Sequence, residues 1–290
     1  MAEEAWRRWG DDDQRGALNL IGPAEVMAGL ALPRQGRILS LAQPISEAMM
    51  APGHRPRPAH FMGRDGGDYA AGGRRPFGFQ FAEDTLFLPL HVGTHIDCLC
   101  HVWYGDQLYN GASGNTVRST GASRSGAETL GPIVTRGILL DCVAVKGAPF
   151  EDGETISADI LAIAIARAGV TLRAGDAVLI RTGWLERNTG NRTPDFFREP
   201  GIDLEAGLML ARADVALVGA DNYAIEVLPF PEGTLFPVHM RLMRDYGIPL
   251  LEGLVLDTLA TAGATEFLFV ASALPIVGGT ASPIAPIAVL

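Results

Sequence analysis

The amino-acid sequence predicts a single α/β domain, and three observations lead to this prediction. Patterns typical of strands and of helices mix along the chain, most regularly from residue 131 onward. No internal repeat and no linker-like segment interrupts the 290 residues. Apolar residues make up 48% of the chain, which is enough to fill a large core. We therefore expect one domain over residues 1–290, with an N-terminal segment and long loop at 1–80 and the core at 81–290.

The first third of the chain predicts few regular elements. "GPAEVMAGLALPRQG" predicts a short helix that has Pro23 in its first turn and ends at Pro33. "RILSLAQPI" predicts a strand, and so does "TLFLPL" further on. Residues 51–80 lack periodicity, so we expect a long loop there.

From residue 131 onward, strands and helices are each expected in several places. The strand patterns are "IVTRGILLDCVAV", "GDAVLIRTGW", "VALVGADN" and a closing "EFLFVASAL". The helix patterns are "SADILAIAIARAG", "DLEAGLMLARA" and "FPVHMRLMRDYG". Ser157 is a candidate N-cap of the first of these helices, and Gly169 ends it.

Composition and charge exclude several classes of partner. The formal net charge of −10 argues against nucleic acid and anionic membrane, because both favour a basic surface. No apolar run reaches the ~18 residues that a membrane span needs, and the first residues lack the apolar region of a secretory signal. The three cysteines cannot all pair within the chain, which suits a reducing compartment. We expect a cytoplasmic protein that binds a small molecule.

The segment "HVGTHIDCLCH", residues 91–101, holds three of the six histidines. Pro89 and Gly93 are unfavourable in a helix, so an extended backbone is expected. Alternation then places His91, Gly93, His95 and Asp97 on one face. Two imidazoles and a carboxylate suit zinc, manganese or iron(II), with coordination positions left open. The alternative interpretation is a strand of buried histidines that are satisfied by hydrogen bonds.

His101 follows the aspartate by four residues. An imidazole beside a metal site is suited to act as a general base or proton shuttle, because its ordinary pKa of ~6.5 lies near neutral pH. It is alternatively a fourth ligand or a hydrogen-bond partner of a ligand. The neighbouring Cys98 and Cys100 are expected to pack as small buried apolar residues.

The other histidines lie far from this segment in the sequence. His54 and His60 fall in the expected loop, where surface or lid positions are favoured over metal ligation. His239 lies on the apolar face of its expected helix, which is typical of a core histidine. Glu252 is set in the apolar stretch "IPLLEGLVL", where a carboxylate needs a partner. His239 and Glu252 together complete a second metal position that shares Asp97, or they bind the substrate.

These residues are similar to those of a known family. "HVGTHIDCLCH" resembles the HxGTHxDxxxH signature of the metal-dependent cyclase-like hydrolases, which include bacterial kynurenine formamidase and isatin hydrolase. "WGDDDQRGALNLI", "RGILLDCVAV", "GDAVLIRTGW", "ADNYAIEVLP" and "FPVHMRLMRDYGIPLLEGLVLDTLA" resemble further blocks of its longer members. The resemblance implies a swivelling β/β/α fold and a homodimer or homotetramer. It also implies that His91, His95 and Asp97 are metal ligands and that His101 accepts and donates the catalytic proton.

The resemblance implies different metals in two branches of the family. In the formamidase branch, His239 and Glu252 correspond to ligands of a second zinc ion, with Asp97 bridging. In the isatin-type branch one manganese ion is expected, and His239 is then free to contact the substrate. The chain has Leu99 where the formamidases have a proline.

The function that we expect is metal-dependent hydrolysis of an amide, lactam or related C–N bond in a small cyclic or aryl substrate. Trp103, Tyr104 and Tyr109 are candidates to form the wall of the substrate pocket, together with Phe77, Phe79 and Phe81, although these side chains are equally typical of a core. One alternative is a metal-dependent lyase, dehydratase or cyclase that abstracts a proton beside a carbonyl. Another is a binding protein in which the metal only stabilises the fold.

Overall fold

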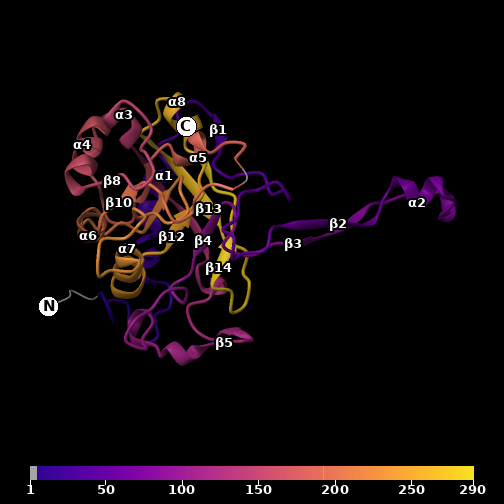
Figure 1. Ribbon diagram of the computed structural model, residues 1–290, viewed down its shortest axis with the longest axis horizontal. Coiled ribbons are helices and arrows are strands. Elements are labelled where there is room, and N and C mark those ends of the chain that lie inside the picture. Colours follow the sequence, from indigo (N-terminus) through magenta and orange to yellow (C-terminus); the bar gives the residue numbers. More distant parts are fainter. Residues whose placement is uncertain (1–4, 192) are drawn as a thin grey trace.

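A nine-stranded sheet forms the centre of the computed structural model, which describes residues 5–191 and 193–290 (Figure 1). The strand order from edge to edge is β1 (Ile38–Ser40), β15 (Ile287–Val289), β13 (Glu266–Ser272), β7 (Pro132–Asp141), β9 (Ala177–Arg181), β11 (Leu217–Ala220), β12 (Leu250–Glu252), β4 (His95–Asp97) and β14 (Ala281–Pro283). The four strands β7, β9, β11 and β12 are parallel, and the strands on both sides of them are antiparallel. The α/β prediction is confirmed.

Helices connect and cover the strands. They are α1 (Pro23–Leu30), α2 (Gly66–Ala70), α3 (Cys142–Lys146), α4 (Ala158–Ala168), α5 (Trp184–Arg187), α6 (Leu204–Arg212), α7 (Pro237–His239), which continues as a π-helix over Met240–Asp245, and α8 (Asp257–Thr261). Short 3₁₀ turns occupy Gly16–Leu20, Pro76–Gly78, Tyr109–Gly111, Gly114–Thr116 and Ala127–Thr129. Short strand pairs are β8 (Thr155–Ile156) with β10 (Gly201–Ile202), and β5 (Val117–Arg118) with β6 (Gly121–Ala122).

The central strands are buried on both faces, which explains their continuous apolar sequences. On β7, Ile138 and Leu140 join an apolar cluster with residues of α3, α4 and α6. Leu139, which points to the opposite face, joins a second cluster with residues of α8. Helix α1 lies against β7, where Gly29 contacts the backbone of Thr135. No Cβ would fit at this position, so the glycine allows the close approach.

Most of the expected elements occur near their expected bounds, and α4 shows why. The Ser157 hydroxyl accepts a hydrogen bond from the Ile160 backbone N–H, and Gly169 ends the helix with a φ of 69°. One boundary was wrong. The expected strand "IVTRGILLDCVAV" ends at Asp141, because that side chain caps α3 by accepting a hydrogen bond from Ala144. The strand at residues 266–272 is followed by β14 and β15, so it does not close the sheet.

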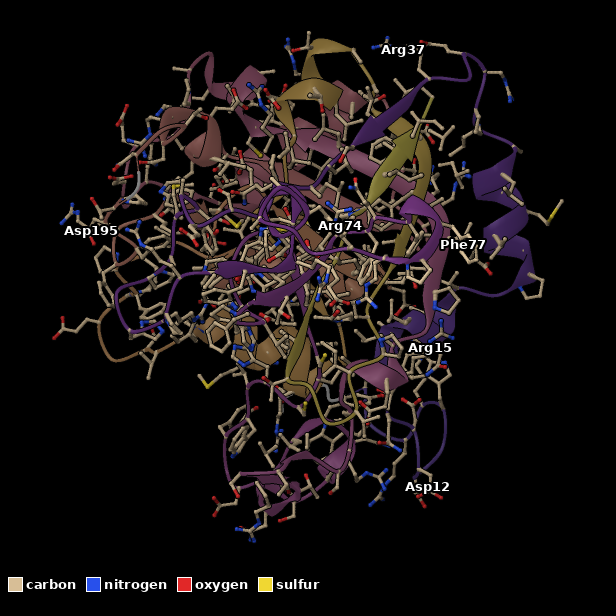
Figure 2. All side chains as sticks on the ribbon, turned by 90° about the vertical axis from the view of Figure 1, so that its right-hand side faces the viewer. Asp12, Arg15, Arg37, Arg74, Phe77 and Asp195 are labelled. Carbon is tan, nitrogen blue, oxygen red and sulfur yellow. The ribbon has the colours of Figure 1, made fainter. Side chains whose placement is uncertain are left out.

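The prediction of an irregular loop over residues 51–80 was wrong from residue 59 onward. Strands β2 (Ala59–Arg64) and β3 (Glu83–Phe87) form an antiparallel hairpin that carries α2. This arm, residues 59–87, projects far from the body of the molecule (Figure 1). Its apolar side chains Phe61, Met62, Phe77, Phe79, Leu86 and Phe87 are exposed. Figure 2 views the molecule along the arm, with Arg74 and Phe77 near its tip.

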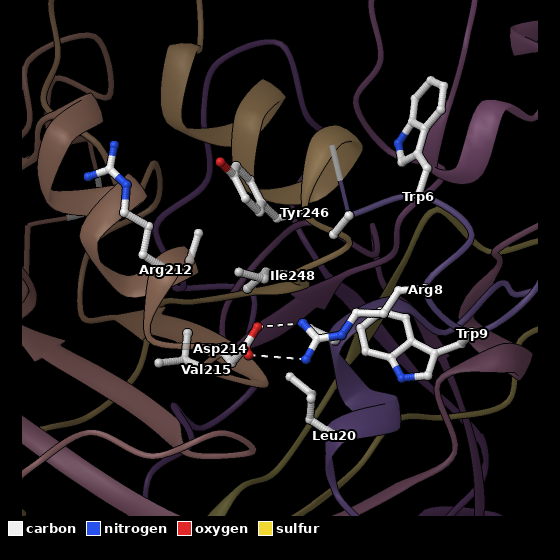
Figure 3. A pocket seen from close by; sticks show the side chains of 12 residues that line it. Trp6, Arg8, Trp9, Leu20, Arg212, Asp214, Val215, Tyr246 and Ile248 are labelled. Carbon is white, nitrogen blue, oxygen red and sulfur yellow. Dashed lines mark hydrogen bonds and ion pairs between the residues drawn. The ribbon is translucent and has the colours of Figure 1, made fainter. Parts of the chain in front are cut away.

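The first described residues, 5–9, pack against the π-helix at Met240–Asp245 and against the turn that follows α6. Arg8 makes two hydrogen bonds to the Asp214 carboxylate (Figure 3). The Trp6 indole N–H donates to the Arg244 carbonyl oxygen over 2.7 Å. These contacts border a cavity of about 350 Å³ whose lining includes none of the predicted metal ligands. Within residues 5–191 and 193–290, no helix combines the length and the apolar character that a membrane crossing requires.

Candidate metal centre

Strand β4 brings the predicted ligands together, because it lies between β12 and β14. His95 on β4 is the register partner of Glu252 on β12, so two residues 157 positions apart face each other. On the other side, Asp97 is paired with Ala281 of β14. His95 and Asp97 share one face of β4, as alternation predicts. This three-residue strand is hydrogen-bonded to a neighbouring strand along both edges, and this pairing fixes the positions of its polar side chains.

The expectation that residues 91–97 are extended throughout was wrong. Only His95–Asp97 is a strand; His91 lies in a turn, and Gly93 has a φ of 73°. This left-handed conformation favours glycine, and a Cβ on Gly93 would also lie 2.3 Å from the Met49 side chain. The Thr94 hydroxyl donates to the Gly253 carbonyl oxygen over 2.7 Å and fixes the start of the strand. Glycine turns the chain, and the turn brings His91 back to Asp97.

The spacing of the polar atoms at this centre suits a shared cation better than it suits hydrogen bonds between them. Nδ1 of His91 lies 2.8 Å from Oδ1 of Asp97, and Nε2 of His95 lies 3.6 Å from the same oxygen. These three buried atoms nevertheless have no hydrogen bond of acceptable geometry. Ligand atoms ~2.0–2.2 Å from one ion lie about 3–3.5 Å from each other, which is close to the spacing here. Orphaned buried polar atoms that converge in this way indicate a site for a divalent ion.

Two groups of potential ligands share Asp97. One is His91, Asp97 and His101; the other is His95, Asp97 and Glu252. His239 adjoins the second group, since its Nε2 lies 3.2 Å from Oε1 of Glu252 and 3.9 Å from Oδ2 of Asp97. His239 is buried and hydrogen-bonded, as the interpretation of a core histidine predicts, and it also lies beside the potential ligands Asp97 and Glu252. The arrangement accommodates one ion, or two ions bridged by the Asp97 carboxylate.

The histidine rings are oriented by hydrogen bonds on their outer nitrogens. Nδ1 of His95 donates to the Gly93 carbonyl oxygen over 2.9 Å, which leaves the Nε2 lone pair for a metal. Nδ1 of His239 lies 2.6 Å from Oε1 of Glu226, a buried carboxylate that also accepts the Val238 and His239 backbone N–H groups. Oriented imidazoles of this kind are typical of metal sites.

The charges of the centre stabilise each other. Burial alone would raise the pKa of Asp97, but His101, His91 and His95 hold it below its ordinary value. Burial lowers the pKa of His239, yet Glu226 and Glu252 outweigh it and raise that pKa to about 10. An ion that bound Nε2 of His239 would have to displace a proton from this nitrogen.

His101 lies beside the ligands in the turn that follows β4. Its ring centroid is 4.1 Å from that of His91, and its backbone N–H donates to the Cys98 carbonyl oxygen. Burial lowers the pKa of His101 to about 4, although the Asp97 carboxylate opposes this. The ring is therefore neutral at neutral pH, which is the form that accepts a proton. Cys98 and Cys100 are buried and free, and burial raises the pKa of both thiols, so neither is a ready thiolate.

A cavity of about 290 Å³ opens onto the centre. Asp97, His101, His239 and Glu252 lie on its polar side. Its wall is aromatic and is formed by Phe196, Phe197, Tyr223, Phe230 and Phe236. His54 and Arg55 also line the cavity, which agrees with the expected lid position of His54. The volume and the lining suit a small planar molecule.

The sequence identified the wrong aromatic residues for this wall. Trp103, Tyr104 and Tyr109 do not line the cavity. The Tyr104 hydroxyl donates to the Asp245 carboxylate, and Tyr109 is buried with its hydroxyl 2.8 Å from Asp13. Trp103 is 38% exposed. Phe77 and Phe79 lie on the projecting arm, away from the cavity of their own chain.

Three functional candidates escaped the sequence analysis: the aromatic residues of the wall, the orienting carboxylate of Glu226, and Glu199. Glu226 and Tyr223 lie in the block "ADNYAIEVLP", whose polar residues were the available signal. Glu199 follows "DFFR" in a segment without periodicity and gave no signal.

The geometry of this centre agrees with the comparisons to known proteins. The model of the putative cyclase family matches residues 39–227. The chain belongs to this family. A crystal structure described as a novel cyclase is similar over 99% of this chain and 99% of its own, with 36% identity and a TM-score of 0.92. Among the curated proteins, none matches the chain.

Other solved structures share the cyclase fold at lower identity. An isatin hydrolase bound to the product analogue thioisatinate is 21% identical, with a TM-score of 0.67 over 93% of this chain and 99% of its own. A predicted metal-dependent hydrolase from Bacillus stearothermophilus is 22% identical, with a TM-score of 0.56 over 87% of this chain and 97% of its own. The cyclase-like fold implied by the sequence resemblance is confirmed, and its structural relatives include metal-dependent hydrolases.

Proposed function

We propose that this member of the cyclase family is a metal-dependent hydrolase that cleaves the C–N bond of a small cyclic amide or aryl amide. The observation that carries the proposal is the convergence of unpartnered His91, His95 and Asp97 atoms beside His101 and an aromatic cavity. A bound divalent ion would polarise the carbonyl group and lower the pKa of water. Manganese or zinc suits this mixture of nitrogen and oxygen donors.

The residues of the chain have distinct roles in this proposal. His91, His95 and Asp97 hold the ion, and His239 and Glu252 hold a second ion or contact the substrate. The aromatic wall holds the planar part of the substrate. Neutral His101 takes the proton of the attacking water and returns it to the leaving nitrogen. His101 is thus the catalytic residue.

A lyase, dehydratase or cyclase would use the same residues to abstract a proton beside a carbonyl group. A metal that only stabilises the fold would instead need a closed coordination sphere. The aromatic cavity beside His101 favours a catalytic site over this last alternative. The cytoplasmic location and the exclusion of nucleic-acid and membrane partners remain predictions of the sequence.

Elemental analysis and product mass test the proposal. We expect the purified protein to contain manganese or zinc, and to convert at least one member of a panel of lactams, cyclic imides and N-formyl aryl amines. A ring-opened lactam or imide is expected to weigh one water molecule more than its substrate. An N-formyl aryl amine is expected to give formate and the free amine, whose masses together exceed that of the substrate by one water molecule. Metal removal should abolish turnover, and re-addition should restore it. A product of unchanged mass would replace the hydrolase with a cyclase or isomerase, and loss of water would indicate a dehydratase.

We also propose that the protein forms a homodimer or homotetramer through the arm at residues 59–87. An isolated two-stranded hairpin is at most marginally stable in water. This arm nevertheless projects from the body of the molecule (Figure 1), and its side chains Phe61, Phe77 and Phe87 are exposed. Contiguous exposed apolar surface is typical of protein–protein contacts. A second copy of the chain is the partner that is always present at a matching concentration.

Light scattering after size-exclusion chromatography tests this association. The wild type is expected to elute as an oligomer, and the double variant Phe61→Ser, Phe87→Ser as a monomer, because burial of each phenylalanine favours association by about 1.5–3 kcal/mol. Leu274→Ser, at an exposed position outside the arm, is the matched control and should leave the mass unchanged. A monomeric wild type, or an oligomeric double variant, would contradict the proposal.

A further inference from the structure

The two oxygens of the Glu199 carboxyl group differ in their hydrogen bonding. The side chain is 0% exposed, and the backbone is fixed by hydrogen bonds in both directions with Leu228. Oε2 accepts the Tyr223 backbone N–H over 2.9 Å. Oε1 has no hydrogen-bond partner among the described residues, although it is completely buried. Oε2 therefore contributes a hydrogen bond to the folded structure, whereas Oε1 contributes none among the described residues.

This unpartnered oxygen belongs to a residue of the candidate active-site cavity. Glu199 lines the same 290 Å³ cavity as Asp97, His101 and Glu252, but it is in neither group of potential metal ligands. An unsatisfied buried polar atom destabilises the folded protein, so a native structure rarely retains one without a use. A ligand in the cavity would satisfy it.

The surroundings of Glu199 determine which hydrogen-bond role Oε1 has. Burial raises the pKa of this carboxyl group well above its ordinary value, and the negative charges of Glu252 and Asp152 act in the same direction. The raised pKa favours the neutral, protonated form of this carboxyl group. Because the Tyr223 backbone N–H contacts Oε2, Oε1 is the oxygen that is free to carry the proton. An O–H group at Oε1 would then be a hydrogen-bond donor without a partner among the described residues, on a side chain that lines the cavity.

We propose that Glu199 is a substrate-recognition residue: its Oε1 hydroxyl donates a hydrogen bond to a second acceptor, such as a carbonyl oxygen, on a planar substrate. This inference rests on the proposed function for the position of the first, reacting carbonyl at the metal centre. Phe196, Phe197 and Tyr223 supply the surface against which the planar ring packs. The preferred substrates are thus cyclic amides or aryl amides with a further carbonyl group, and molecules that lack it bind more weakly.

A pair of inert probes tests the second acceptor. Dimethylindanedione and dimethylindanone are planar, have no C–N bond to hydrolyse, and differ by one carbonyl oxygen. Calorimetry on the metal-loaded wild type should show about tenfold tighter binding of the diketone, as expected for one buried hydrogen bond. Glu199→Gln keeps the shape and an N–H donor, so it should keep this preference. Glu199→Met has no donor, and its preference should fall to about twofold, the statistical advantage of two equivalent carbonyls.

Infrared difference spectroscopy tests the same inference without the Met variant, which leaves the Tyr223 backbone N–H unpaired and lowers stability. The wild type minus Glu199→Gln spectrum should contain a protonated carboxyl band that shifts when the diketone is added. No preference in the wild type, an equal loss in the Gln and Met variants, or no such band would overturn the inference. Because the probes are not hydrolysed, a Glu199-dependent preference without amide turnover would sink only the proposed function. Amide turnover without that preference would sink only the role of Glu199.

Discussion

Asp97→Ala is expected to abolish both metal binding and turnover. Asp97 is the one ligand common to the two groups, and its Oδ1 lies within 3.6 Å of both His91 and His95 nitrogens. Loss of a residue that merely orients a ligand already lowers metal affinity by ~10–100-fold, so loss of the shared ligand should exceed that. Elemental analysis of the purified variant and a calorimetric metal titration measure the effect.

The control for this variant is Asp84→Ala, which removes an exposed carboxylate of the arm. It should bind metal like the wild type. If Asp97→Ala bound the same number of ions with unchanged affinity, the metal centre would not lie at β4. The oriented rings of His91 and His95 would then need another explanation.

His101→Ala should retain the metal and lose turnover by ~10²–10⁴-fold, the usual contribution of a general acid–base group. His91, His95 and Asp97 remain in this variant, so the ion keeps its ligands. The kcat should fall while KM changes little, because the aromatic wall that binds the substrate is untouched. Steady-state kinetics and metal content, measured on the same preparation, separate the two effects.

His60→Ala is the matched histidine control, since His60 is exposed on the arm and paired with Asp84. It should retain full kcat. If His101→Ala lost the metal as well as turnover, His101 would be a ligand rather than the proton acceptor. Full activity in His101→Ala would remove it from the mechanism altogether.

The part of the centre that could be predicted from the sequence is the part that is local in the chain. His91, His95 and Asp97 fall within seven residues, so their spacing alone indicated a metal site. Glu252 could be named only by its apolar surroundings, because its position opposite His95 depends on the pairing of β12 with β4. The proposed role of Glu199 depends on a hydrogen bond from the Tyr223 backbone N–H, 24 residues away. No sequence pattern encodes that contact.

The arm escaped prediction for a related reason. Strands of a core are recognised in a sequence by alternating apolar and polar residues or by a continuous apolar run. Both faces of β2 and β3 are largely exposed, so neither signal is imposed on their sequences. The aromatic residues of the cavity wall are similarly scattered over residues 196–236, whereas the expected ones lay next to the motif. Proximity in sequence was a poor guide to which rings face the substrate.

The edge of the sheet also has a consequence for biosynthesis. β4 acquires its second neighbour only when β14 pairs with it, and Thr280 just before β14 reaches Nε2 of His91 over 3.1 Å. Residues 280–283 leave the ribosome long after the histidines they support. A nascent chain therefore contains the histidine and aspartate ligands before β14 can pair with β4 and fix their positions. We expect the cation to bind only after β14 has been translated. The metal available in the cell should therefore affect how much of the completed protein is loaded with metal.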